Sequence, residues 1–429
     1  MKVSKFNFYY PLPNQDILIY NTATNSLAVI EEENFTYIKD KANKNVIIED
    51  QELLNNLLLG GFVVENSVNE LDLLKLKLLE SRFDKRGFSL TIAPTLDCDF
   101  ECIYCYEKNN QINTYMSLKT QNQLMNFIQN RLRGLEKFKI SWYGGEPLLA
   151  MDIIENLSNK IIKICRERHI EYSASIVTNG YSLTAEIAQK LKNFAINKVQ
   201  ITIDGPKDTH NLRRPLKNGG PTFEKILENI KNVCDILTVA IRINVDKKNI
   251  EQFDEVLDIL VKNKLQSKIQ VYLGFVDDAN NCYSPAKCLS SNKFFKLNYE
   301  TNKKIRAKNF MNTKKVYPEL VNNYCGADHI AHYVVGPTGL LYKCVNDIGI
   351  RNKAVDSVFY NSSNKYNISL YNAYMLNMPT EDPVCSKCNL LPICMGGCPH
   401  TKINSKKSSC SEYKYNLENY LKQYAQDFI

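Results

Sequence analysis

Three cysteines stand close together after a short apolar run. Cys98, Cys102 and Cys105 follow the run 88–94 at spacings of four and three. The apolar run predicts a strand, and the cysteines then lie in the loop that leaves it. Thiolates on a compact loop can hold a soft metal centre. Three ligands are enough to bind a 4Fe–4S cube and leave one iron open, where a small chelating molecule can bind.

A structural zinc site is the alternative interpretation of these thiols. Zinc normally takes four ligands, and its motifs usually show paired Cys-x2-Cys or Cys/His spacing. No fourth ligand closely follows Cys105. The spacing therefore favours the iron–sulfur interpretation and leaves zinc as the competing one.

Composition limits the class of protein. The chain has 429 residues, which predicts two or three domains, and 54 Lys and Arg against 46 Asp and Glu, a mild excess that we interpret as solvated surface and not as nucleic-acid binding. The first residues lack the apolar region of a signal peptide, and no apolar run approaches the roughly 20 residues of a membrane helix. We therefore expect a cytoplasmic protein without membrane contact, whose 14 cysteines serve metal centres and not disulfides.

The spacing of the three cysteines, with Tyr104 directly before the third, resembles the signature of the radical SAM superfamily. The resemblance implies that the open iron binds the amino and carboxylate groups of S-adenosylmethionine (SAM). Electron transfer to the sulfonium then gives a 5'-deoxyadenosyl radical.

Alternating strands and amphipathic helices follow over residues 86–308. In one helix Ile154, Leu157, Ile161 and Cys165 repeat on a single face. Six strands that are each followed by a helix imply parallel pairing with right-handed crossovers. We expect an α/β fold, a partial (β/α)6 radical SAM barrel that is open on one side, with its chemistry at the C-terminal strand ends. The expected strands are 87–94, 137–143, 171–177, 198–203, 238–245 and 268–276.

Polar turns follow several of these strands. Gly144-Gly145-Glu146-Pro147 combines two glycines that let a backbone approach a ligand with a carboxylate that can accept from an ammonium. An ordinary turn is the alternative. The resemblance implies that this tetrapeptide binds the methionine amino group of SAM. The full set that we expect to bind the cofactor is Tyr104, Gly144, Gly145, Glu146, Pro147, Thr178, Asn179, Thr202, Asp204, Arg214, Asn244 and Leu273.

Within this set the resemblance implies different roles. Thr178 and Asn179 begin a turn near the SAM ribose, although a plain turn explains them equally well. Thr202 and Arg214 bind the SAM carboxylate, because a guanidinium suits a carboxylate, with Arg213 as the competing arginine. His210 orients this loop and does not transfer protons. Asn244 and Leu273 approach the ribose and adenine.

Residues 1–82 carry no metal ligands and read as a small sheet with helices. Strands are expected at 6–10, 17–20, 27–30 and 62–64, and helices at 32–41, 50–59 and 71–79. Such a winged-helix-like module resembles the RiPP recognition element, which implies a domain where a leader peptide adds a strand to the sheet edge. A structural extension of the barrel is the alternative.

The region 309–429 contains a second group of cysteines, which resembles the seven-cysteine SPASM motif. A single zinc ribbon would account for four of them. The resemblance implies two auxiliary 4Fe–4S clusters, one held by Cys385, Cys388, Cys394 and Cys410 and the other by Cys325, Cys344 and Cys398. The second cluster either keeps an open iron or is completed by Cys282 or Cys288. Cys165 and Cys234 fall in helix patterns as core thiols.

The whole-chain resemblance implies a maturase of a ribosomally synthesised precursor peptide, with a leader sequence, that forms a thioether between a cysteine sulfur and a carbon. A flavodoxin- or ferredoxin-type donor would supply electrons. The alternatives are a carbon–carbon crosslinking maturase, an anaerobic sulfatase-maturating enzyme and an iron–sulfur electron carrier. Sulfatase maturases carry an aspartate base where this chain has Val345, with Asp347 two residues further on. No residue of this chain is singled out as the catalytic base.

Overall fold

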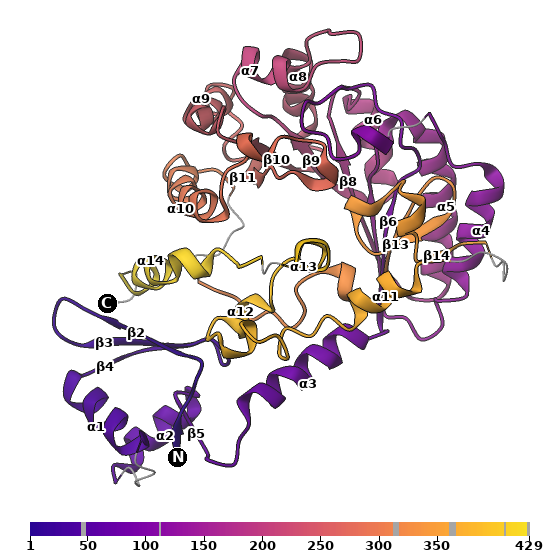
Figure 1. Cartoon of the computed structure of the whole chain (residues 1–429). Coiled ribbons are helices and arrows are strands. Elements are labelled where there is room, and N and C mark those ends of the chain that lie inside the picture. The colour runs from indigo at the N-terminus through magenta and orange to yellow at the C-terminus, as the bar shows by residue number, and fades with distance from the viewer. Residues whose placement is uncertain (44–48, 111–112, 312–316, 360–365, 407–408, 427–429) are drawn as a thin grey trace. The chain divides into compact units, whose positions relative to one another are not determined.

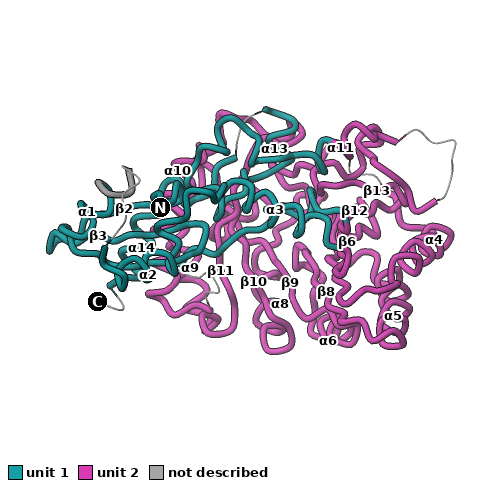
Figure 2. Tube along the Cα trace, turned by 90° about the horizontal axis from the view of Figure 1, so that it is seen from below, with its two compact units in different colours: residues 1–84, 314–330, 373–429 teal, residues 85–313, 331–372 magenta. Residues whose placement is uncertain are grey.

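The computed structural model describes residues 1–43, 49–110, 113–311, 317–359, 366–406 and 409–426, and it divides into two compact units. Unit 1 comprises residues 1–84, 314–330 and 373–429, and unit 2 comprises residues 85–313 and 331–372 (Figure 2). Both units are discontinuous in sequence. The partition into domains at 1–82, 86–308 and 309–429 stays a prediction, and its third range is shared between the two units.

Unit 2 is built on one sheet of nine strands in the order β11-β10-β9-β8-β7-β6-β12-β13-β14. The first six strands of this unit along the chain all pair in parallel with their sequence neighbours. The α/β class with a mostly parallel sheet is therefore confirmed. The six strands are β6 (Gly87–Ile92), β7 (Lys137–Trp142), β8 (Glu171–Thr178), β9 (Ile196–Thr202), β10 (Thr238–Val245) and β11 (Ile269–Phe275).

Helices of unit 2, among them α5, α6 and α10, pack along one side of this curved sheet (Figure 1). Amphipathic sequence explains why they pack there: the apolar stripe of α5 includes Ile154, Leu157 and Ile161, all at most 1% exposed. Residues 207–213, expected as part of a loop, form the short helix α7. The helices are α4 (Leu118–Gln129), α5 (Met151–Glu167), α6 (Ala185–Asn193), α7 (Lys207–Arg213), α8 (Phe223–Val233), α9 (Phe253–Lys262) and α10 (Ser291–Ala307).

Strand periodicity separates the two faces of the sheet. In β9 and β10 the buried residues Ile201, Ile241 and Ile243 alternate with polar residues such as Thr202 and Asn244. Successive side chains of a strand point to opposite faces. The apolar set therefore packs beneath the helices, and the polar set is left for the inside of the curved sheet.

Three strands from a distant part of the sequence extend the sheet. β12 (His332–Val335) pairs in parallel with β6, and β13 (Leu340–Tyr342) and β14 (Asp356–Ser357) follow in antiparallel pairing. Their side chains Val334 and Tyr342 share a buried cluster with Ala93 and Leu96 of the loop that leaves β6. Residues 331–372 thus stabilise the segment that leads to the first cysteine.

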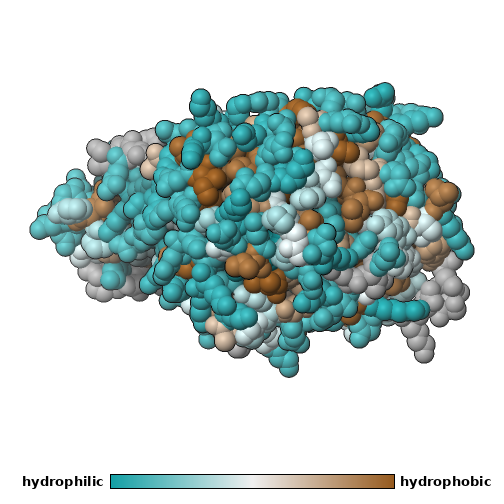
Figure 3. Space-filling view, turned by 90° about the horizontal axis from the view of Figure 1, so that it is seen from above, coloured by the Kyte–Doolittle hydropathy of each residue, from teal (hydrophilic) through white to brown (hydrophobic). Residues whose placement is uncertain are grey.

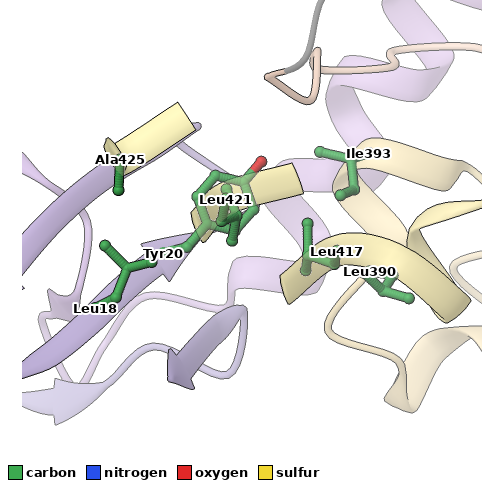
Figure 4. Close-up of a cluster of buried hydrophobic side chains, with 7 residues drawn as sticks. All are labelled: Leu18, Tyr20, Leu390, Ile393, Leu417, Leu421 and Ala425. Carbon is green, nitrogen blue, oxygen red and sulfur yellow. The ribbon is translucent and has the colours of Figure 1, made fainter. Parts of the chain in front are cut away.

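The two ends of the chain form unit 1. An antiparallel sheet, β2-β3-β4, and a two-stranded pair, β1-β5, come from the N-terminal region. Leu18 and Tyr20 of β3 pack against Leu417 and Leu421 of the last helix and against Leu390 and Ile393 (Figure 4). The N-terminal elements are β1 (Lys2–Val3), β2 (Asn7–Pro11), β3 (Ile17–Asn21), β4 (Ser26–Ile30), α1 (Glu32–Asn43), α2 (Gln51–Leu59), β5 (Val63–Val64) and α3 (Glu70–Phe83).

The remaining helices belong to the C-terminal region. They are α11 (Ile368–Met375), α12 (Leu391–Cys394), α13 (Pro399–Ser405) and α14 (Tyr413–Gln426). The strands and helices predicted for residues 1–82 coincide with β2 to β5 and α1 to α3. A winged-helix character of this region and a SPASM domain both stay predictions.

The surface is mixed. On the face drawn in Figure 3, hydrophobic residues form small patches separated by hydrophilic ones. Within the described ranges, no helix has both the length and the apolar character needed to cross a bilayer.

A buried arginine holds one cysteine-bearing segment of unit 1. Arg82, near the end of α3, is 1% exposed and lies 3.1 Å from Asp328 between Nη2 and Oδ2. It also donates to the carbonyl oxygen of Asn377 at 2.7 Å and to the side chain of Asn323. Asn323 in turn donates to the carbonyl oxygen of Cys325 at 3.0 Å. The guanidinium therefore fixes the loop that carries Cys325.

Replacing Arg82 with leucine is expected to destabilise unit 1 by roughly 3–5 kcal/mol, because the substitution leaves Asp328 buried without its counter-charge. Urea unfolding followed by circular dichroism measures this loss. Lys75→Ala is the matched control, since Lys75 lies on the same helix in an exposed ion pair with Glu381. Equal midpoints for the two variants would contradict the assignment.

Candidate active site

The three cysteines of the first motif line one pocket of about 350 Å³ in unit 2. Their loop leaves β6 at its C-terminal end, where the chemistry was expected. Backbone hydrogen bonds anchor it to the segment after α7, from Glu101 N to Pro215 O at 2.9 Å and from Ile103 N to Arg213 O at 3.0 Å. The N–H of Phe100 also donates to the Cys98 sulfur at 3.4 Å.

Burial controls the protonation of these thiols. It raises the pKa of Cys98 and Cys102 above the ordinary value, and it raises the pKa of Cys105 to about 12. A cysteine must be deprotonated to bind a metal, and binding releases the proton. The positive charge of a bound metal centre would favour the thiolate form of all three. Three soft ligands on one loop that lines a pocket fit an iron–sulfur cube.

The Gly144-Gly145 pair lies against the backbone of the cysteine loop. Gly145 N donates to Thr95 O at 3.3 Å, and Glu146 N donates to Asp97 O at 2.8 Å. A Cβ atom at Gly144 would meet Thr95 O at 2.3 Å, and one at Gly145 would meet Asp97 O at 2.2 Å. Gly144 also has a φ of +116°, which favours glycine. Both glycines also line the pocket. The absence of side chains therefore allows close packing against the cysteine loop and leaves space in the pocket.

Glu146 is fully buried and does not line the pocket. Its carboxylate accepts from Thr178 Oγ1 at 2.7 Å, from Asn179 N at 2.7 Å and from Leu148 N at 2.9 Å. Burial raises the pKa of Glu146 to about 7, against the pull of these donors. Asn179 then donates to Asp99 of the cysteine loop at 2.7 Å. Glu146 therefore holds the Thr178–Asn179 turn against that loop.

The hydroxyl of Tyr104 joins three other elements to the cysteine loop. It donates to Asp204 Oδ2 at 2.5 Å, accepts from Arg214 Nη1 at 2.8 Å and accepts from Asn244 Nδ2 at 3.0 Å. One donor and two acceptor positions use its full hydrogen-bonding capacity. The residue before the third cysteine thus ties the loop to the ends of β9, α7 and β10.

The two neighbouring arginines have different environments. Arg213 is 4% exposed and pairs with Asp246 at 2.7 Å and Asp204 at 3.4 Å. Arg214 lines the pocket, and its buried Nε has no hydrogen-bond partner among the described residues. The geometry favours Arg214 over Arg213 as the arginine that can bind a ligand.

His210 is fully buried and accepts through Nδ1 from Asp204 N at 3.2 Å. Burial and the two arginines hold its pKa well below the ordinary value. A low pKa favours the neutral ring, and the hydrogen bond links His210 to the turn after β9; its orienting role stays a prediction.

The structure separates the expected cofactor-binding residues into two groups. Those that line the pocket are Tyr104, Gly144, Gly145, Thr178, Asn179, Thr202, Arg214 and Asn244. Glu146, Pro147, Asp204 and Leu273 are outside its lining. Leu273 is 6% exposed and alternates with Gly274, so it belongs to the face of β11 that packs beneath the helices. The apolar lining at this edge comes from Phe275 and Val276.

Several pocket residues were missed in the sequence. Gln200 and Arg242 line the pocket two positions before Thr202 and Asn244, so strand alternation would have found them. Glu107 is 4% exposed, lines the pocket and has its pKa raised to about 7 by burial. Val345 and Asn346 also line it, although no sequence pattern links them to the barrel.

The second cysteine group is divided between the units. Cys344 belongs to unit 2, and the others belong to unit 1. Burial raises the pKa of Cys388 above its ordinary value, and the thiols of Cys394 and Cys410 add to this rise. Lys414 donates to the Cys410 sulfur at 3.5 Å. The assignment of these cysteines to two clusters stays a prediction.

The two additional thiols lie in the loop after β11. Cys282 donates to Tyr106 O at 3.3 Å, while Cys288 donates to Ser284 O at 3.5 Å within its own loop. Asn280 bridges Tyr106 O and Asn346 O, at 3.1 and 2.8 Å. Cys282 therefore lies near the cysteine loop and the segment after Cys344. Within the described parts of the chain, no three His, Cys, Asp or Glu side chains converge to hold a single metal ion.

Gly145→Ala is expected to prevent assembly of the cluster on the first cysteine loop, because the new methyl group would displace the Asp97 carbonyl. The iron content after anaerobic reconstitution should fall by about four atoms per chain, the content of one cube. Gly87→Ala is the control, since a Cβ atom at Gly87 meets nothing within 4 Å. Full iron content in Gly145→Ala would contradict this role.

Comparison with known proteins identifies the fold. A family model described as the Radical SAM superfamily matches residues 92–260. The solved structure of anSMEcpe with bound AdoMet and the Cp18Cys peptide aligns with a TM-score of 0.60 at 18% identity, covering 78% of this chain and 98% of that one. Streptococcus suis SuiB bound to the precursor peptide SuiA aligns with a TM-score of 0.54 at 17% identity, covering 92% and 95%. These likenesses show the fold.

Curated relatives match parts of the chain. An uncharacterised protein of Methanocaldococcus jannaschii is 32% identical over 180 residues, which cover 40% of this chain and 58% of that protein. A cysteine-type anaerobic sulfatase-maturating enzyme of Clostridium novyi is 25% identical over 362 residues, which cover 74% and 89%. The chain spans about half the length of the first curated relatives that it matches, 58% and 52%. Residues 92–260 match this family model, so the chain contains a radical SAM domain.

Proposed function

We propose that this protein is a radical SAM maturase that forms a thioether crosslink in a ribosomally synthesised precursor peptide. The observation that carries the proposal is the single pocket that contains the three thiols, the Gly144-Gly145 backbone and Arg214. These groups are a set of soft metal ligands, a close backbone approach and a guanidinium. Together they suit a cube with an open iron and a zwitterionic nucleotide bound to it.

The chain's own residues have separate tasks in this proposal. Cys98, Cys102 and Cys105 hold the cube, and SAM bound to it supplies a 5'-deoxyadenosyl radical. Arg214 binds the SAM carboxylate, because its guanidinium faces the pocket and retains an unused donor. Thr202 and Asn244 lie beside the nucleotide, and Glu146 keeps the Thr178–Asn179 turn in place.

The overall change removes two hydrogens from the peptide. One hydrogen leaves a substrate carbon for the deoxyadenosyl radical. Bonding of this carbon to a cysteine sulfur would release the thiol proton and one electron, which an auxiliary cluster would accept. Cys385, Cys388, Cys394 and Cys410 would hold one such cluster, and Cys325, Cys344 and Cys398 would hold the other. A reduced flavodoxin- or ferredoxin-type protein supplies the electron that starts the reaction.

Residues 1–82 are the proposed docking domain for the leader of the peptide. β2 and β4 are the edge strands of its three-stranded sheet, and an edge strand can pair with an extended peptide. An apolar pocket of about 260 Å³, lined by residues that include Ile30, Phe35 and Ile38, lies beside β4. It can take an apolar side chain of the leader.

Formylglycine formation is the second candidate, supported by the match to the Clostridium novyi enzyme over 74% of this chain. The pocket argues against it. Val345 and Asn346 line the pocket, whereas Asp347 is 1% exposed, does not line it and lies 3.9 Å from Lys353. The segment after Cys344 therefore offers no carboxylate to the pocket as a base.

Cys98→Ala, Cys102→Ala and Cys105→Ala are each expected to abolish SAM cleavage, because a cube with two remaining ligands is not held in the pocket. Chromatographic measurement of 5'-deoxyadenosine under dithionite checks this, and electron paramagnetic resonance should still detect the auxiliary clusters. Cys234→Ala, a buried thiol of the α8 C-cap, is the control. Cleavage retained by any loop variant would refute the cluster assignment.

Mass spectrometry tests the reaction itself. The candidate substrate is a short cysteine-containing peptide encoded beside this chain's gene. Anaerobic incubation with SAM and reductant should lower its mass by two hydrogens and leave no alkylatable thiol at the crosslinked cysteine. A product that carries formylglycine, or two lost hydrogens with every thiol still alkylatable, would support one of the other candidates.

A further inference from the structure

The inner face of the barrel sheet is polar one layer below the predicted SAM residues. Gln200 and Arg242 precede Thr202 and Asn244 by two positions on β9 and β10, and all four line the pocket. Two residues of a strand span about 6.6 Å. Because the cysteine loop covers the C-terminal strand ends, this second layer lies deeper in the barrel than the loop.

Arg242 supplies the positive charge in the layer that it forms with Gln200. Its guanidinium is half-buried, and among the described residues its one hydrogen bond goes from Nε to Asn244 Oδ1, at 2.7 Å. The four N–H groups on its two terminal nitrogens make no hydrogen bond to those residues. By contrast, Arg213 has two carboxylate partners. Arg242 therefore presents an unneutralised charge to the pocket.

Glycine at position 274 makes room for this guanidinium. A Cβ atom there would meet Arg242 Nε and Asn244 Oδ1, each at 2.3 Å. Gly274 pairs with Asn244 in the parallel register of β10 and β11, and Tyr272 pairs with Arg242. The absence of a side chain at 274 lets the arginine lie across β11 along the pocket wall.

The other polar groups nearby do not neutralise the charge. Gln200 accepts from the hydroxyl of Tyr272, so that pair is satisfied internally. The carboxylates that line the pocket are Glu107 and Asp277, and neither forms an ion pair with Arg242 within the described ranges. The pocket wall at Arg242 therefore carries a positive charge, and the terminal N–H groups of this guanidinium can donate to a ligand.

We propose that Arg242 binds the carboxylate of an acidic residue in the peptide substrate, next to the residue from which hydrogen is removed. This inference rests on the proposed peptide-modifying function. The planar guanidinium fork matches a carboxylate with two parallel hydrogen bonds, which a lysine or an amide cannot reproduce. The interaction fixes the position of the substrate relative to the nucleotide in the layer above, as an unselective radical requires.

The test uses reconstituted, SAM-loaded full-length enzyme and two capped amino acids, N-acetyl-aspartate N-methylamide and N-acetyl-asparagine N-methylamide. Anaerobic titration calorimetry should show that wild-type enzyme binds the aspartate probe at least about tenfold more tightly, as expected for a charge-assisted pair. Arg242→Gln should lose this preference. Arg242→Lys should retain part of it, because the charge remains without the fork.

Arg168→Gln is the matched control, since Arg168 is an exposed arginine of the same unit outside the pocket. Equal binding of the two probes to wild-type enzyme, or an unchanged preference in Arg242→Gln, would overturn the proposal. A loss of SAM affinity in Arg242→Gln would also overturn it, because the guanidinium would then serve the nucleotide. The binding assay needs no turnover, so its failure is separate from a failure of the proposed reaction.

Discussion

The candidate site depends on how one phenol hydroxyl anchors the cysteine loop. Tyr104 is bound at once by Asp204 after β9, by Arg214 at the end of α7 and by Asn244 in β10. A loop with three thiols has no regular hydrogen-bonding ladder of its own. Its geometry must therefore come from contacts to neighbouring elements, and Tyr104 alone supplies contacts to two strands and one helix end.

A second set of contacts holds the other side of the loop. Gly144 and Gly145 bring the end of β7 into backbone contact with residues 95–97, and Asn179 reaches Asp99 from the end of β8. Glu146 takes part by fixing the turn at 178–179, not by facing the pocket. Because buried polar groups are costly when unpaired, a network in which each member is satisfied makes one loop conformation strongly preferred. The three thiols and Arg214 are among the groups that line the pocket.

The cost of an unpaired buried charge also explains why charges are distributed unevenly around the pocket. Arg213 is neutralised by two aspartates and supports the frame, while its neighbour Arg214 and the more distant Arg242 face the pocket without such partners. A charge that the fold leaves unpaired in a half-buried position is available to a ligand of opposite charge. Arg213 and Arg214 therefore differ in their partners and not in their sequence environment.

The local patterns of the sequence determined the strands and helices of residues 1–82, the six parallel strands of the barrel and the turns that follow them. These features depend on periodicity and turn chemistry within a few residues, which the chain order alone contains. Strand alternation also predicts that Gln200 and Arg242 lie on the same face of the sheet as Thr202 and Asn244. It predicts that Leu273 lies on the opposite face.

Only the tertiary structure decided which distant segments join. It paired β12 with β6, brought Val345 into the pocket lining and packed the last helix onto β3. It also distinguished Arg213 from Arg214, which are adjacent and chemically identical. Such choices depend on apolar surfaces and charges far apart along the chain, whose complementarity exists only once the fold brings them together, so no local pattern could record them.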